Sequence, residues 1–180
     1  MLDSKIVGEL KYRGHPERAI FMIDEHESFE LLNEPLDDRL REFSQAYRIW
    51  SQDCLPLYDQ FDFLEWPELV SWMTVVHYPF TDRHRYSLKN ARVTFDGARR
   101  VSMFEADMTD QAPDELDDQF QDRWSSIYGL CLRHKAPECA RSNVFGIGKD
   151  HVRFEIMLFP FAEKGGAISH ILSVVQRVYD

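Results

Sequence analysis

The chain has 180 residues, of which 44% are hydrophobic and 13% aromatic, so it is long enough to bury one sizeable core. Its 31 acidic and 21 basic residues give a net charge of −10 at pH 7, which opposes binding to nucleic acid and to anionic membranes. The sequence has no apolar run near the roughly 18 residues that a membrane span requires. We therefore expect no nucleic-acid partner and no membrane span.

The location is inferred from the first residues and from the cysteines. The first twenty residues lack a basic leader followed by a continuous apolar run, which argues against a secretion signal. Three cysteines are an odd number in a chain too large to need disulfides for stability. We expect a cytoplasmic protein with free thiols.

Residues 1–35 show no clear pattern, and we treat them as an N-terminal extension without assigned structure. A helix is predicted from Asp37, with Asp37 or Asp38 as its cap. Apolar side chains recur there at helical spacing and share one face. These residues are Leu36, Leu40, Phe43, Tyr47 and Trp50.

A shorter helix is predicted over Phe63 to Trp72, and the β-branched run TVVHYPF after it predicts the first strand of a sheet. Arg83 to Lys89 alternates in polarity and predicts a second strand. The stretch Ala91 to Phe95, followed by Asp96-Gly97, is interpreted as a turn or a single helical coil.

A long helix ending near His134-Lys135 is predicted after the acidic, solvated loop Thr109 to Asp118, and Pro137 prevents its continuation. Its apolar positions are Leu116, Phe120, Trp124, Ile127, Tyr128 and Cys131. Three strands are predicted to follow, at Cys139 to Phe145, Val152 to Phe161 and Ile168 to Val178, with Gly165-Gly166 between the last two.

Several phrases in this order resemble a bacterial family of standalone PAS domains. They are LREFSQAYRIW, Leu55-Pro56, FDFLEWPELVSWMTVVHY, HRYSLKNARVTFDG and MLFPFAEKGGAISHILSVVQ. The resemblance covers roughly residues 37 to 178. The sequence departs from the family pattern at Phe63, where Pro is usual, and at Ser87 and Asn90, where Arg and Gly are usual.

The resemblance implies an α+β domain over residues 36–180, with a PAS-like five-stranded antiparallel sheet, helices packed on one face and an N-terminal flanking helix. It also implies a sensory or regulatory role, with a histidine kinase or another signalling protein as partner and a homodimer as a possible assembly. We recognise no kinase, cyclase or DNA-binding segment, so we expect any signal to pass by contact.

A small-molecule pocket is expected where aromatic and apolar side chains of the sheet and long helix meet. The pocket candidates are Trp72, Tyr86, Leu88, Phe95, Phe104, Trp124, Tyr128, Phe154 and Ile156. Ordinary core packing is the alternative explanation for these positions. The apolar face from Leu36 to Trp50 is the candidate partner or dimer face, and covering the chain's own sheet is the alternative for it.

No cofactor and no metal site is evident. Cys131, His134 and Cys139 lie close in sequence and are suitable zinc ligands, but a fourth ligand is missing and buried thiols explain the cysteines better. Four histidines, His77, His134, His151 and His170, are compared with haem ligands, but a lone histidine more often lies at the surface or forms hydrogen bonds within the core.

No catalytic residue is predicted, because the sequence has no nucleophile elbow, phosphate loop, dinucleotide fingerprint or HExxH helix. Two alternatives remain. One is a cone-shaped α+β isomerase or dehydratase, which needs a buried acid or base, for which His77 and Asp107 are the candidates. The other is a purely structural dimerisation module.

Overall fold

The computed structural model describes residues 20–24, 27–52, 54–79, 90–115, 118–144, 147–164 and 166–179. Its helices and strands follow in the order β1 (Ile20–Asp24), β2 (Glu27–Leu32), α1 (Asp38–Trp50), α2 (Pro67–Val70), β3 (Met73–His77), β4 (Arg92–Asp96), α3 (Ala98–Phe104), α4 (Asp118–His134), β5 (Glu138–Asn143), β6 (Arg153–Ala162) and β7 (Ile168–Val178). Short 3-10 turns lie at Tyr58–Gln60, Phe63–Glu65 and Pro113–Glu115.

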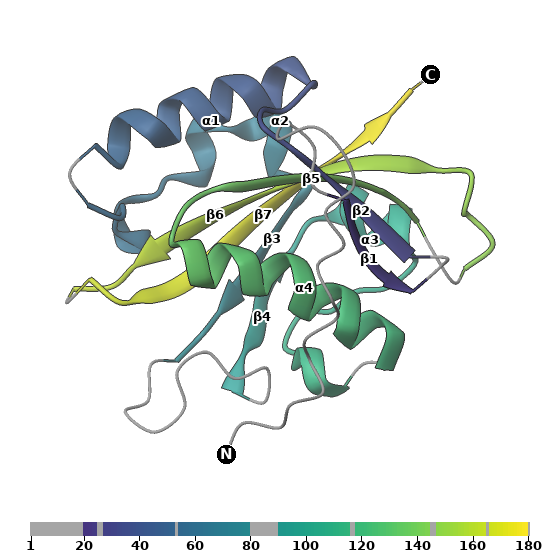
Figure 1. Ribbon diagram of the computed structural model, residues 1–180. Helices are drawn as coiled ribbons and strands as arrows, with labels where there is room; N and C mark the ends of the chain where they lie inside the picture. The colour runs from purple at the N-terminus through teal and green to yellow at the C-terminus, as the bar shows by residue number, and fades with distance from the viewer. Residues whose placement is uncertain are drawn as a thin grey trace.

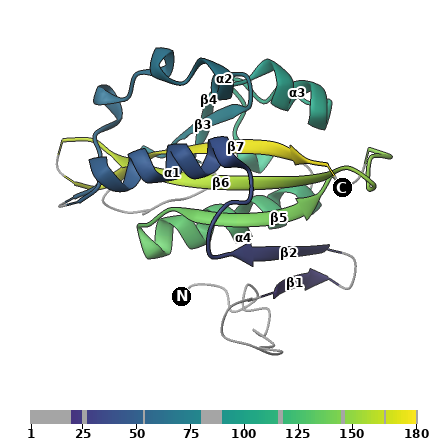
Figure 2. The same ribbon diagram turned by 90° about the horizontal axis from the view of Figure 1, so that it is seen from above.

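Within the part of the chain that the structure describes, seven strands form one antiparallel sheet in the order β1-β2-β5-β6-β7-β3-β4. The predicted α+β fold is confirmed. Four of the five predicted strands correspond to β3, β5, β6 and β7, and the fifth, Arg83 to Lys89, lies outside the described residues. Residues 20–32, for which no structure was predicted, add β2 beside β5 and β1 beside β2 (Figure 2).

Helices cover both faces of the sheet, because the predicted N-terminal flanking helix, α1, packs on the face opposite to α4. Figure 1 shows α1 on one side of the central strands and α4 on the other. The reason lies in β6, which is buried on both faces: Phe154 and Ile156 pack in the core beneath α4, and Met157 and Phe159 pack in the core beneath α1. Alternate residues of a strand point to opposite faces, so an apolar run of this kind needs two helical layers.

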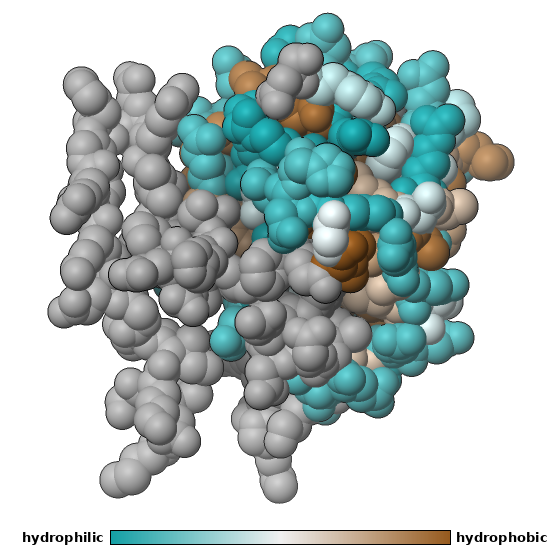
Figure 3. Space-filling model, turned by 90° about the vertical axis from the view of Figure 1, so that its right-hand side faces the viewer, coloured by the Kyte–Doolittle hydropathy of each residue, from teal (hydrophilic) through white to brown (hydrophobic). Residues whose placement is uncertain are grey.

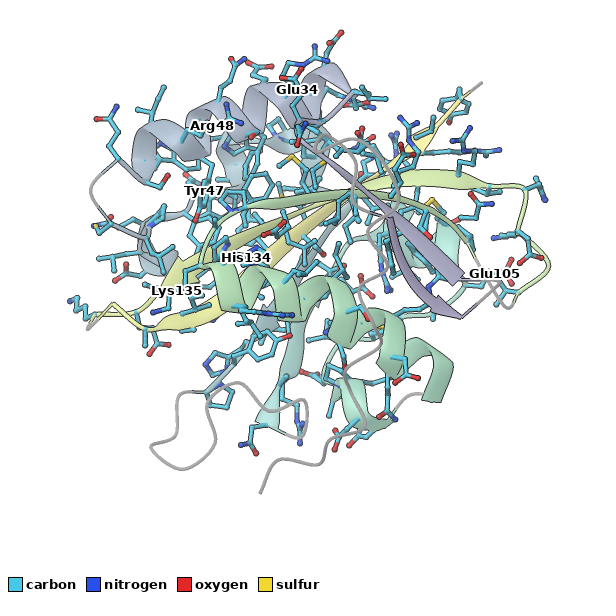
Figure 4. All side chains as sticks on the ribbon, in the orientation of Figure 1. Glu34, Tyr47, Arg48, Glu105, His134 and Lys135 are labelled. Atoms are coloured by element: carbon cyan, nitrogen blue, oxygen red, sulfur yellow. The ribbon has the colours of Figure 1, made fainter. Side chains whose placement is uncertain are left out.

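α1 begins and ends as its sequence predicts. The Asp37 carboxylate accepts hydrogen bonds from the backbone N–H groups of Arg39 and Leu40, which caps the helix. Leu40, Phe43 and Tyr47 are buried against the sheet. Figure 4 shows Tyr47 on the sheet side of α1, where its hydroxyl donates a hydrogen bond to the carbonyl of Pro160.

α4 also ends where predicted, at His134, and Lys135 follows it with a left-handed backbone (φ 53°). The acidic segment before the helix is not a wholly solvated loop, because Ala112 and Pro113 are buried.

Two other predictions need correction. The turn or single helical coil expected at Ala91 to Phe95 is strand β4, and Gly97 is the residue that precedes helix α3. The single helix expected at Phe63 to Trp72 is divided into a 3-10 turn and α2, because Pro67 starts a new helix at its first position. The strand expected at Arg83 to Lys89 lies outside the described residues.

A buried ion pair fixes α3 to the sheet. Arg100 Nη1 lies 2.7 Å from the carboxylate of Asp96, at the end of β4. The same carboxylate accepts a hydrogen bond from the backbone N–H of Met108, and it accepts another from Thr74 on the neighbouring strand. These contacts satisfy both buried charges, as burial requires.

The surface shown in Figure 3 is largely hydrophilic where its residues are described, with hydrophobic residues in small patches. Among the described residues, none of the helices is both long and apolar enough to cross a membrane.

Candidate functional site

The seven pocket candidates that the structure describes are distributed over the cores on the two faces of the sheet. Trp124, Tyr128, Phe154 and Ile156 all pack in the buried core beneath α4. There the Trp124 and Tyr128 rings stack with centroids 4.3 Å apart, and the Tyr128 hydroxyl lies 2.9 Å from Ser173 Oγ. The structure therefore places these side chains in contact with one another, as the core interpretation expects.

The other candidates lie apart from this group or are not described. Phe104 packs edge-on against Phe154, with ring centroids 5.3 Å apart, at the margin of the same core. Phe95 packs against the core beneath α1, and Trp72 contacts both cores. Tyr86 and Leu88 lie outside the described residues.

The partner-face candidates mostly cover the chain's own sheet. Leu40, Phe43 and Tyr47 are fully buried in the core beneath α1, so they are not available to a partner in this structure. Leu36 and Trp50, at the two ends of the row, keep 56% and 38% of their surface exposed.

An open hollow of about 410 Å³ lies on the α1 side of the sheet. It is lined by Tyr58, Phe63, Val70, Thr94, Phe95 and His170. Its lining is mostly apolar and aromatic, and its size falls within the range of small-molecule sites. The rings of Phe63 and Phe95 approach to 5.5 Å between centroids and join the segment after α1 to the sheet. Of these lining residues, Phe95 alone was among the pocket candidates predicted from the sequence.

His170 is the ionisable group of this hollow. Tyr58 stacks on its imidazole, with ring centroids 3.8 Å apart and planes 11° from parallel. Ser169 Oγ lies 2.9 Å from its Nδ1. Burial, and then the nearby charge of His77, lower the pKa of His170 to about 4. His170 is therefore neutral at neutral pH, the state in which imidazole can accept a hydrogen bond or bind a metal.

A second histidine lies beside His170. His77 and His170 are directly paired residues of β3 and β7, and their rings lie 4.7 Å apart between centroids. Strand alternation puts both on the α1 face, in line with Val75 and Leu172 of the core beneath α1. Glu163, just after β6, brings a carboxylate oxygen to 3.9 Å from His77 Nε2. We call His77, Glu163 and His170 the histidine cluster.

The zinc interpretation of Cys131, His134 and Cys139 is not supported by their positions. Cys131 is buried in the core beneath α4, whereas Cys139 is buried in the core on the opposite face of the sheet. His134, at the end of α4 in Figure 4, instead lies 2.6 Å from the carboxylate of Glu138. Burial raises the pKa of both thiols, which keeps them protonated and poor metal ligands.

Asp107 does not provide the buried acid that the isomerase or dehydratase alternative needs. Its side chain is exposed, and hydrogen bonds from Thr109 lower the pKa of its carboxyl below the ordinary value. His77 is partly buried, and it belongs to the histidine cluster rather than to an enclosed pocket.

No family model matches the chain, and no curated protein matches it. Among solved structures, the chain is similar to a sensory box sensor histidine kinase from Vibrio cholerae, with a TM-score of 0.41 and 14% sequence identity. The alignment covers 64% of this chain and 88% of that one. A likeness at this level carries no conclusion about function.

Proposed function

We propose that this chain is a non-enzymatic regulatory module of the PAS type that binds a small ligand in the hollow between Tyr58, Phe95 and His170. The observation that carries the proposal is the composition of that hollow: aromatic side chains surround one imidazole whose lowered pKa keeps it neutral. Such a lining favours a small, flat, largely apolar molecule with one hydrogen-bonding group.

The position of the hollow suggests how binding is signalled. One wall comes from residues 58–70, which follow α1, and the other comes from β4 and β7 of the sheet. A ligand between them contacts both walls and so favours one position of the 58–70 segment over others. In this proposal a partner such as a histidine kinase detects the position of the 58–70 segment by direct contact. The proposal also includes membership of the standalone PAS family.

The test is to fill the hollow and look for loss of the ligand. Thr94 lines the hollow and is exposed, so Thr94→Trp adds a large side chain there and removes only the 3.4 Å hydrogen bond from the Thr94 hydroxyl to the Val75 carbonyl. Ser102→Trp is the matched control, because Ser102 is also exposed but lies on α3. Native and denaturing mass spectrometry of the purified proteins report any small molecule that is lost on unfolding.

We expect the wild type and Ser102→Trp to carry the same small molecule and Thr94→Trp to lack it. A wild type without any bound molecule, or a Thr94→Trp protein that keeps it, would contradict the proposal.

A further inference from the structure

We propose that His77, Glu163 and His170 form a binding site for a divalent transition-metal ion of the zinc class. This goes beyond the proposed function, because it concerns an ion and does not depend on a ligand in the hollow.

The geometry brings the three donor groups together. One ligand atom from each residue can be chosen so that all three lie within 4.8 Å of one another. Tetrahedral zinc with bonds of 2.0–2.1 Å needs its ligand atoms about 3.4 Å apart. The donors are thus within about 1.5 Å of the required separation before any ion binds.

The residues differ in how freely they can close that gap. The two histidines are held on adjacent strands, and the His170 ring is fixed in orientation by the stacked Tyr58 and by Ser169. Glu163 is exposed and lies in the connection between β6 and β7. Its side chain can therefore swing toward a bound ion while the histidines stay in place.

The donor types select the kind of ion. Two imidazoles and one carboxylate suit zinc and its neighbours in the first transition series, whereas calcium and magnesium prefer oxygen ligands alone. Three protein ligands also leave a fourth position open to water or to another molecule. That position lies near the hollow, because His170 belongs to both sites.

The experiment is a titration of the untagged protein with Zn²⁺ in competition with a chromophoric chelator. We expect one tight Zn²⁺ site per chain. His77→Ala should lower the affinity for Zn²⁺ by at least about 10- to 100-fold, because a loss of that size follows even when only a residue that hydrogen-bonds to a metal ligand is changed. Glu163→Gln weakens it less, since the two imidazoles remain. His77→Asn, with circular dichroism to confirm folding, provides a second substitution at the same position.

His134→Ala is the matched control, because His134 also contacts a glutamate, Glu138, but outside the histidine cluster. Its affinity for Zn²⁺ should equal that of the wild type. Co²⁺ in place of Zn²⁺ should give the visible absorption of a tetrahedral ion in the wild type, and His77→Ala should abolish it.

The proposal is overturned if the wild type binds no Zn²⁺, or if folded His77→Ala and His77→Asn proteins bind it as tightly as the wild type. Filling the hollow by Thr94→Trp removes none of the three ligands, and removing His77 leaves the residues that line the hollow intact. Either site can therefore fail without the other.

Discussion

The Glu155 carboxylate, on central strand β6, accepts a hydrogen bond from the backbone N–H of Asp37, the residue that caps α1, at 3.0 Å. Its other oxygen accepts one from the N–H of Leu36 at 2.8 Å. Glu155 is almost completely buried, so these two N–H groups are its main compensation for lost water. The contact fixes the start of α1 to the sheet.

Glu155→Gln should therefore lower the free energy of unfolding by about 1–3 kcal/mol, because the amide nitrogen cannot accept a hydrogen bond and leaves one N–H without an acceptor. Urea unfolding measures this loss. Glu65→Gln, at an exposed position, is the control and should stay within about 0.5 kcal/mol of the wild type. Equal urea midpoints for Glu155→Gln and the wild type would refute the role of Glu155.

Asp37 should make the stability of α1 depend on pH. Partial burial by itself raises the pKa of this carboxyl, but the hydrogen bonds from Arg39 and Leu40 outweigh burial and lower it below 3.8. Between the folded and unfolded pKa values the unfolded chain binds more protons, so stability falls as the pH falls through this window. Asp37→Ser keeps a cap of similar strength but removes the ionisable group.

The check is to follow the unfolding free energies of the wild type and Asp37→Ser from neutral pH into the acid range. We expect the difference in unfolding free energy between the wild type and Asp37→Ser to shrink as the pH falls below about 3.8. A difference that stays constant across this range would show that the Asp37 charge contributes nothing to stability.

Gly97 is expected to tolerate no side chain. A Cβ added there would lie 2.5 Å from both the carbonyl carbon and the oxygen of Ser71, and backbone atoms cannot move aside cheaply. Gly97→Ala should destabilise the protein by about 1–3 kcal/mol or more. Gly129→Ala is the matched control, since nothing lies within 4 Å of its added Cβ and alanine favours helix α4.

Thermal unfolding should show opposite shifts for the two substitutions, with Gly129→Ala stabilising by about 0.8–1 kcal/mol. A Gly97→Ala protein as stable as the wild type would mean that Ser71 is displaced without cost.

The elements with strong periodicity could be predicted from sequence. α1, α4, β6 and β7 were found because their apolar residues recur at helical or strand spacing over ten or more residues. β4 was missed because its five residues are too few for alternation to outweigh the turn signal of Asp96-Gly97. That signal instead marks the start of α3, where only glycine fits against Ser71.

Most of the candidate site could not be predicted from the periodicity of the sequence. His77 and His170 are single histidines in separate strands, and only the register of β3 against β7 pairs them. Register depends on the whole sheet, so a single sequence does not provide it. The available signal was that each histidine continues the apolar alternation of its strand, at Val75 and at Leu172, which places both on the same face.

The central claim is that binding occurs in the hollow on the α1 side and not within the core beneath α4. Two-dimensional ¹H–¹⁵N spectra of the protein as isolated, and after its ligand is removed by unfolding and refolding, test it most directly. We expect the largest differences at the backbone amides of Tyr58, Phe95 and His170. Largest differences at Trp124, Tyr128 and Ile156 would contradict the claim and return the site to the pocket that the sequence suggested.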